Sequence, residues 1–365
     1  MVTEPAVIRQ PGLGSDGTKG RSRCRSQRHH RPGIVECLTQ RADWEVIALA
    51  RKPSDAVDHA RFVSVDLLDP RDCHDKLGTL SDITHVFYAA YKEQPSEPGQ
   101  VAVNGAMLRN LVQVVEAAGP GLVHINQMQG TKAYGCQFGP FKTPAKETDP
   151  RHFPPNFYYD QEDFLRERQQ GKAWTWSALR PNLVIGPGAG HPMNIIMVIA
   201  VYAVICRELG IPLWFPGSHA GFSILLEATD VAHLANAAIW TATEPRCGNE
   251  VFNITNGDYF RWQHLWPGFA EYFGMKAAPP LPIPLAEMMA DKGHVWEHMT
   301  QKYALRPYRL DQLVSWGFGE FVFRIPYDTI SDTTKARRYG FHDVVETEEM
   351  FRRKFTELRE QEYIP

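Results

Sequence analysis

Apolar and polar positions from residue 44 onward follow the order expected of strands alternating with helices. Short apolar runs rich in β-branched residues, typical of buried strands, are separated by segments whose apolar residues recur every three or four positions. The expected strands are WEVIALA (44–50), RFVSVDL (61–67), THVFYAA (84–90), GLVHINQ (121–127) and WTWSALRP (174–181). This alternation predicts an α/β fold in which a parallel sheet is covered by helices.

Two helices are expected between these strands. One spans 101–118 and a second should begin near Asn156. The first carries one apolar face, formed by Val101, Leu108, Leu111, Val112 and Val115. After residue 190 the alternation gives way to longer helices, aromatic segments and proline-rich joints. We therefore expect a sheet domain over 33–190 and a smaller, mostly helical lobe over 191–365, some of whose elements return to the sheet.

The first 32 residues do not fit this pattern. The segment GLGSDGTKGRSRCRSQRHHRPG (12–33) is basic, rich in glycine and serine, and without apolar periodicity, so it is expected to be disordered. A dinucleotide-binding sheet would need its first strand and a glycine-rich turn just ahead of the helix that GIVECLTQ (33–40) begins. In this chain the expected position of both is occupied by an aberrant segment.

Composition narrows the function classes. The net charge of −3 provides no field that would favour nucleic acid or an anionic membrane. Six scattered cysteines without a C-x-x-C pair argue against a disulfide framework or a zinc site. The longest apolar stretch, 193–206, is shorter than the roughly 20 residues of a membrane span and predicts a buried helix. We expect a cytoplasmic protein with no metal and no nucleic-acid or membrane partner, for which a homodimer stays open.

Several short motifs then occur in one order along the chain. They are THVFYAAY (84–91), NGAMLRNLV (104–112), HINQMQGTKAYG (124–135), FGPF (138–141), NFYYDQED (156–163), WSALRP (176–181), FNITNGD (252–258) and YIP (363–365). Taken together they make the chain resemble the progesterone 5β-reductase/iridoid synthase-like (PRISE-like) family of atypical extended short-chain dehydrogenases/reductases. The resemblance implies a doubly wound Rossmann-type sheet that binds NADPH, a lobe that binds the substrate, and reduction of an electron-poor C=C bond conjugated to a carbonyl.

A catalytic pair follows from the chemistry together with the resemblance. Hydride addition to a conjugated C=C bond develops negative charge on the carbonyl oxygen, which a fixed phenol can stabilise, and an adjacent ammonium would lower the pKa of that phenol. The resemblance matches Tyr158 to the family's catalytic tyrosine and Lys132 to its catalytic lysine. In the superfamily's usual Y-x-x-x-K arrangement the lysine would stand at position 162, where this chain has Glu162. The alternative is that Tyr158 is only a packed aromatic side chain and Lys132 only a solvated loop residue.

Cofactor contacts are expected near the ends of the strands. Arg51 follows a strand at the position where NAD-preferring enzymes place an acidic residue, and Lys52 doubles the charge, so the pair favours the 2′-phosphate of NADP. An exposed charge pair at a strand end is the alternative. The resemblance further implies that four residues lie along the cofactor, two at its adenine and two at its nicotinamide: Asp66, Leu67, Pro181 and Val184.

The aberrant segment has an explanation in the genetic code. Read one nucleotide forward with suitable codons, residues 20–31 become VALVAGVSGITG, an apolar strand running into spaced glycines. We interpret residues 1–32 as the product of a reading-frame or splice-model error that leaves the chain without its glycine loop, and a genuine basic N-terminal segment is the alternative. The predicted function is that of an NADPH-dependent reductase of an enone or enal. A carbonyl/alcohol dehydrogenase using the same pair on a carbonyl substrate, and a non-catalytic NADP-sensing protein, remain as alternatives.

Overall fold

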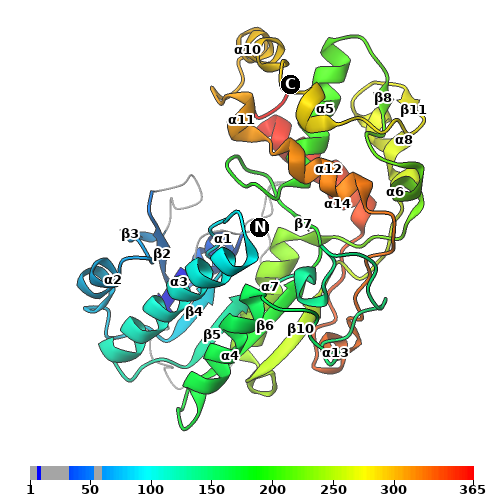
Figure 1. The fold of residues 1–365 in the computed structure, drawn as a ribbon. Helices are drawn as coiled ribbons and strands as arrows, with labels where there is room; N and C mark the ends of the chain where they lie inside the picture. Colours follow the sequence, from blue (N-terminus) through cyan, green and yellow to red (C-terminus); the bar gives the residue numbers. More distant parts are fainter. Residues whose placement is uncertain (1–5, 10–32, 53–59) are drawn as a thin grey trace.

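The protein is built on a seven-stranded sheet with the strand order β10-β6-β5-β4-β1-β2-β3 (Figure 1). Our computed structural model describes residues 6–9, 33–52 and 60–365. The strands are β1 (Ala6–Arg9), β2 (Glu45–Ala50), β3 (Arg61–Ser64), β4 (His85–Tyr88), β5 (His124–Met128), β6 (Thr175–Pro181) and β10 (Glu250–Ile254). β2 pairs with β3, and β4, β5, β6 and β10 pair in succession, all of them parallel. The predicted α/β fold is confirmed, and each of the five predicted strands is present.

Helices cover both faces of the sheet because neighbouring side chains of a strand point to opposite sides. Val46 and Ala48 of β2 pack in one apolar cluster with α1 and α7, whereas Ile47 and Leu49 pack in another with α2, α3 and α4. These helices are α1 (Ile34–Thr39), α2 (Pro70–Leu77), α3 (Glu97–Ala118), α4 (Phe157–Gln169) and α7 (Val231–Thr243). The sheet is therefore doubly wound, and α7 and β10 of the second half belong to it.

Local capping residues set where the two predicted helices begin. α4 starts at Phe157 because the Asn156 side chain accepts a hydrogen bond from the first turn, so this prediction is confirmed. α3 starts at Glu97, four residues before the predicted position. Ser96 accepts a hydrogen bond from the Gly99 amide and a proline occupies the first turn, which moves the beginning of the helix ahead of its apolar stripe.

The position in the sheet between β2 and β4 is taken by β1, which runs antiparallel to both. Arg9 pairs with Glu45, so β1 leaves the sheet beside the first residue of β2. For residues 6–9 the structure therefore differs from the expected disorder, since a short strand here satisfies backbone groups that β2 and β4 would otherwise expose. Residues 10–32, which carry the rest of that expectation and the expected position of the glycine loop, lie outside the described residues.

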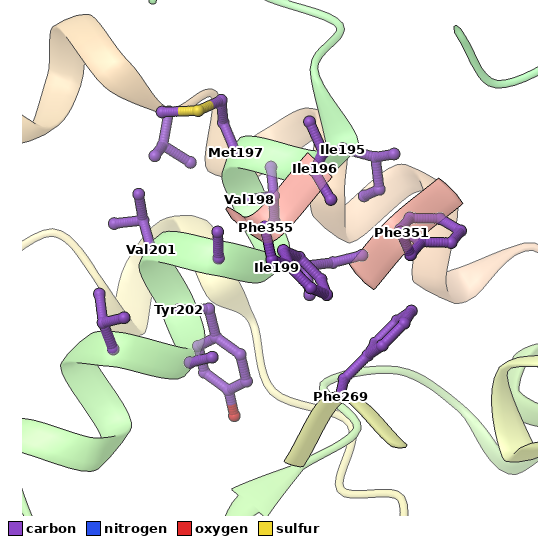
Figure 2. Packing of buried hydrophobic residues seen from close by; sticks show 14 of the residues in the cluster. Ile195, Ile196, Met197, Val198, Ile199, Val201, Tyr202, Phe269, Phe351 and Phe355 are labelled. Carbon is purple, nitrogen blue, oxygen red and sulfur yellow. The ribbon is translucent and has the colours of Figure 1, made fainter. Parts of the chain in front are cut away.

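The second lobe is built round α5 (Ile195–Glu208), in which every residue from Ile195 to Cys206 is buried. Figure 2 shows this helix beside Phe269, Phe351 and Phe355, which come from α8 and α14. The predicted buried helix is confirmed. The other main helices of the lobe are α8 (Trp262–Tyr272), α10 (Gly293–Lys302), α12 (Trp316–Arg324) and α14 (Thr347–Glu360), which gather above the sheet in Figure 1.

The remaining elements are short. They are β7 (Val184–Ile185), β8 (Leu213–Trp214), β9 (Thr229–Asp230), β11 (Ala277–Ala278), α6 (His219–Ser223), α9 (Leu285–Met288), α11 (Leu310–Leu313), α13 (Thr334–Arg338), and the 3₁₀ turns η2 (Thr131–Tyr134) and η3 (Pro245–Cys247). Within the described ranges, no helix combines the length and the apolar character needed to cross a bilayer.

Candidate active site and cofactor cavity

Three segments that carry expected site residues meet at one glycine. A Cβ atom on Gly130, just after β5, would lie 3.3 Å from the Tyr158 hydroxyl oxygen and 3.5 Å from the Pro181 carbonyl oxygen. The first turn of α4, the end of β5 and the end of β6 therefore approach each other closely, and a side chain at position 130 would press on the phenol. The structure thus brings Tyr158 and Pro181 together beside the turn that bears Lys132.

Asn156 joins this turn to α4. Its side-chain oxygen accepts from the Tyr158 amide at 2.9 Å, and its side-chain nitrogen donates to the Lys132 carbonyl at 3.0 Å. His152 Nε2 lies 2.9 Å from the same carbonyl oxygen. One side chain consequently caps the helix of Tyr158 and holds the backbone of Lys132, which fixes the two predicted catalytic residues relative to each other.

The electrostatics of the pair differ from the expectation. Burial raises the pKa of Tyr158, and the nearby Tyr91 phenol and Cys136 thiol raise it further. Lys132 is not among the groups that shift it. Burial also raises the pKa of Cys136, against smaller opposing effects of the Thr131 hydroxyl and the Lys132 ammonium. Tyr158 is therefore a protonated phenol suited to donating a hydrogen bond, because desolvation outweighs any effect of the lysine on it.

A cavity of about 590 Å³ lies along the ends of β2 and β3. Four of the predicted cofactor residues line it: Arg51, Lys52, Asp66 and Leu67. Asp66 is held by its own loop, since its carboxylate accepts from the Leu68 amide at 3.0 Å. The cavity is roomy, and basic and acidic groups are part of its lining, which fits the adenosine end of a dinucleotide.

Tyr91 connects this cavity to Tyr158. It lines the cavity, its ring centroid lies 5.6 Å from that of Phe157, and its phenol is close enough to Tyr158 to raise its pKa. Of the two contacts predicted at the nicotinamide, neither Pro181 nor Val184 lines the described part of the cavity. Val184 begins β7, pairs with Thr229 of β9 and packs against the cluster of α1 and α7.

Three residues of the site were missed at the level of sequence. Gly130 and Tyr91 stand inside the quoted motifs, but nothing in their spacing indicates a close approach to a phenol. Asn156 carried a usable signal, because an asparagine before an expected helix is a typical N-cap. Its second bond, to Lys132, joins positions 24 residues apart and depends on the tertiary structure.

Comparison with known proteins decides the family. A model of the PRISE-like Rossmann-fold domain matches residues 64–365. The chain belongs to the PRISE-like family. Similar proteins include a 3-oxo-Δ(4,5)-steroid 5β-reductase of Arabidopsis thaliana, 36% identical, with 82% of this chain and 80% of that protein covered. An (S)-8-oxocitronellyl enol synthase of Camptotheca acuminata is 35% identical with the same coverage. A short chain dehydrogenase of Penicillium aethiopicum is 31% identical over 91% of this chain and 95% of its own length.

Solved structures show the same architecture for this PRISE-like protein. A UDP-glucose 4-epimerase of Thermotoga maritima superposes with a TM-score of 0.62 at 18% identity, covering 90% of this chain and 94% of the epimerase. RMD of Pseudomonas aeruginosa, complexed with NADPH, gives a TM-score of 0.58 at 15% identity, covering 84% and 91%. These likenesses confirm the Rossmann-type fold. Membership of the family, with its reductase and dehydrogenase relatives, makes the protein an NAD(P)-dependent oxidoreductase of the short-chain dehydrogenase type.

Proposed function

We propose that this PRISE-like protein is an NADPH-dependent ene-reductase that reduces the C=C bond of an enone or enal. The observation that carries the proposal is the buried, protonated Tyr158 hydroxyl, which lies beside Gly130 in a cluster against which Tyr91, a residue of the cavity wall, packs. The names of the relatives support it, since two of them denote a steroid reductase and an enol synthase.

Each residue of the site has a separate role in the proposed reaction. Bound NADPH supplies the hydride. The Tyr158 phenol donates a hydrogen bond to the carbonyl oxygen of the substrate, on which negative charge develops when the β-carbon is reduced. Lys132, whose backbone carbonyl is held by Asn156, brings positive charge to the turn that follows Gly130. The Arg51 and Lys52 cations at the cavity rim select the 2′-phosphate of NADPH.

The test is a panel of conjugated enones and enals beside saturated ketones and aldehydes of matched size. Cofactor oxidation is followed by absorbance, and the products are identified by mass and by proton spectra. The proposal expects a saturated carbonyl product from enones and little turnover of the saturated carbonyl compounds. Reduction of the carbonyl to an alcohol with the C=C bond intact would establish the carbonyl reductase instead.

A further inference from the structure

Glu162 stands where the superfamily's usual motif has its lysine, and the structure shows what it does there. The side chain is buried on α4, one helical turn after Tyr158, with only 4% of its surface exposed. It faces the ends of β5 and β6, which carry two of its partners. There its Oε2 atom accepts hydrogen bonds from Arg180 at 3.1 Å and from Gln129 at 3.2 Å.

Arg180 and Gln129 also bond to each other, and the other carboxylate oxygen of Glu162, Oε1, accepts from the more exposed Arg166 at 2.9 Å and Arg151 at 3.4 Å. The Arg180 Nε atom donates to Gln129 Oε1 at 2.8 Å, and Gln129 reaches the Tyr158 carbonyl at 3.4 Å. Although burial opposes its ionisation, the Arg180 and Arg166 guanidinium groups and Gln129 hold the pKa of Glu162 below its ordinary value. The pair of Glu162 and Arg180 is therefore a buried ion pair.

Each of these three side chains lies close in sequence to a residue of the proposed site. Glu162 follows Tyr158 by one turn of α4, Gln129 directly precedes Gly130, and Arg180 directly precedes Pro181. The set thus links the same three segments that meet round the Tyr158 hydroxyl, one residue or one turn behind the site. We propose that Glu162, Arg180 and Gln129, here called the positioning triad, hold the Tyr158 phenol at a fixed place relative to the Lys132 turn and the end of β6. This inference rests on the proposed function for its kinetic consequences.

A buried ion pair gives little net stability, because the cost of desolvating two charges offsets their attraction. Replacing both members by apolar side chains of similar volume is often neutral for stability. It nevertheless removes the directional bonds that fix α4 to the two strands. Loss of activity without loss of stability is therefore the mark of a positioning role, since a misplacement of about 1 Å can lower a rate by about a hundredfold.

The central experiment is the double variant Glu162→Met/Arg180→Met. We expect a thermal midpoint close to that of the wild type, with KM for the enone and Kd for NADPH changed less than about threefold and kcat lowered by about ten- to a hundredfold. Glu162→Gln keeps an acceptor oxygen for Arg180 and should lose less. Glu167→Met, at an exposed position of the same helix, is the matched control and should leave kcat unchanged. A folded double variant with wild-type kcat would overturn the proposal.

Glu162→Lys gives a second, opposite test because it restores Y-x-x-x-K in the sequence. We expect a loss of activity, because the new ammonium would lie next to the Arg180 guanidinium that now binds Glu162. Activity equal to or above that of the wild type would show that position 162 faces the substrate and would refute the triad. Glu167→Lys makes the same charge change on the exposed face and controls for helix charge.

Amide hydrogen exchange makes the inference testable whatever the reaction is. In Glu162→Met/Arg180→Met, amides of 129–134, 157–162 and 177–180 should all exchange faster than in the wild type, because the triad joins these segments. A change confined to 157–162 would mean that Glu162 supports only its own helix, which contradicts the proposal. If the wild type reduces no enone, the proposed function fails, and the exchange pattern still decides this inference.

Discussion

The Tyr158 hydroxyl is the residue-scale feature on which the proposed chemistry depends. We expect Tyr158→Phe to lower kcat for enone reduction at least about tenfold while NADPH affinity stays within about twofold, because the variant loses only the donor to the developing oxyanion. Lys132→Ala should do the same. Steady-state kinetics and calorimetric titration with NADPH measure both. Tyr272→Phe, which removes a hydroxyl bonded to Thr356 in the second lobe, is the matched control. Wild-type turnover in both site variants would remove the pair from the mechanism.

Arg51 carries a second prediction at this scale. Arg51→Ala should narrow the preference for NADPH over NADH by about 1.5–3 kcal/mol, the range of hydrogen bonds to charged groups. The comparison of kcat/KM for the two cofactors measures it. Arg61→Ala removes an exposed cation from the neighbouring β3, outside the cavity, and should leave the preference unchanged. Equal use of both cofactors by the wild type would contradict the assignment before any mutation.

At the scale of elements, Asn156 ties a turn to a helix through two separable bonds. Asn156→Ala removes both the cap of α4 and the donor to Lys132, so it should lower stability by about 1 kcal/mol and also lower kcat. Asn156→Asp keeps an acceptor for the cap but has no donor for the Lys132 carbonyl. Chemical unfolding should therefore show recovered stability in the aspartate variant, and kinetics should show that kcat does not recover. Parallel recovery of both would mean that the cap alone matters.

The junction between the sheet and the second lobe contains a buried carboxyl, Glu227. Its Oε1 atom accepts from the Ser331 amide at 2.9 Å and from Asn182 at 3.4 Å. Burial raises the pKa of Glu227 to about 7 from 4.5, against hydrogen bonds from Ser331, Asn182 and Thr255. The folded protein therefore retains a proton here that the unfolded chain loses between those two pH values.

The sign of the pH dependence follows from linkage. The stability contributed by this proton is fully present below about pH 4.5, declines as the pH rises, and is lost above about pH 7. The change amounts to about 3 kcal/mol at most. Glu227→Gln should flatten the stability curve across this window and make the protein at least as stable as the wild type at pH 8. Glu297→Gln, at an exposed position, is the control. A curve for Glu227→Gln parallel to the wild type would exclude the role of Glu227.

At the scale of the whole molecule, the cofactor edge depends on what precedes α1. β1 runs antiparallel and leaves the sheet beside the first residue of β2, whereas a parallel strand would end at the cofactor edge, next to the beginning of α1. Gly33, which caps α1, donates its amide to the Glu36 carboxylate at 2.7 Å. A carboxylate therefore occupies the end of α1 where a dinucleotide fold presents backbone amides to phosphate.

The reading-frame hypothesis gives the prediction for this scale. Sequencing of the gene and transcript should find a shifted reading of codons 20–31 that encodes an apolar strand and three spaced glycines. A variant carrying VALVAGVSGITG at these positions should bind NADPH at least about tenfold more tightly than the chain as translated, because the turn presents preorganised amides to the diphosphate. Calorimetry measures both affinities. Codons that yield no such glycines in any frame would end the hypothesis, and equal affinities would show that the loop is dispensable.

The sequence by itself determined the parts of this protein that depend on local order. Alternating apolar runs specified the five predicted strands, Asn156 marked the beginning of α4, and the ordered motifs identified the family. These signals are readable because strand and helix periods and caps involve residues close together in the chain. Arg51 and Asp66 could be placed at a cavity for the same reason, since ends of parallel strands share one edge.

Only the tertiary structure decided how distant segments meet. No spacing indicates that Gly130 approaches the Tyr158 phenol, or that Glu162 faces Arg180 rather than the substrate. The pKa of Tyr158 was expected to fall beside Lys132, and it rises because burial, which the sequence does not specify, is the larger effect. The sequence does not specify the antiparallel direction of β1 either. A strand in this position can satisfy the hydrogen-bonding groups of β2 and β4 in either direction.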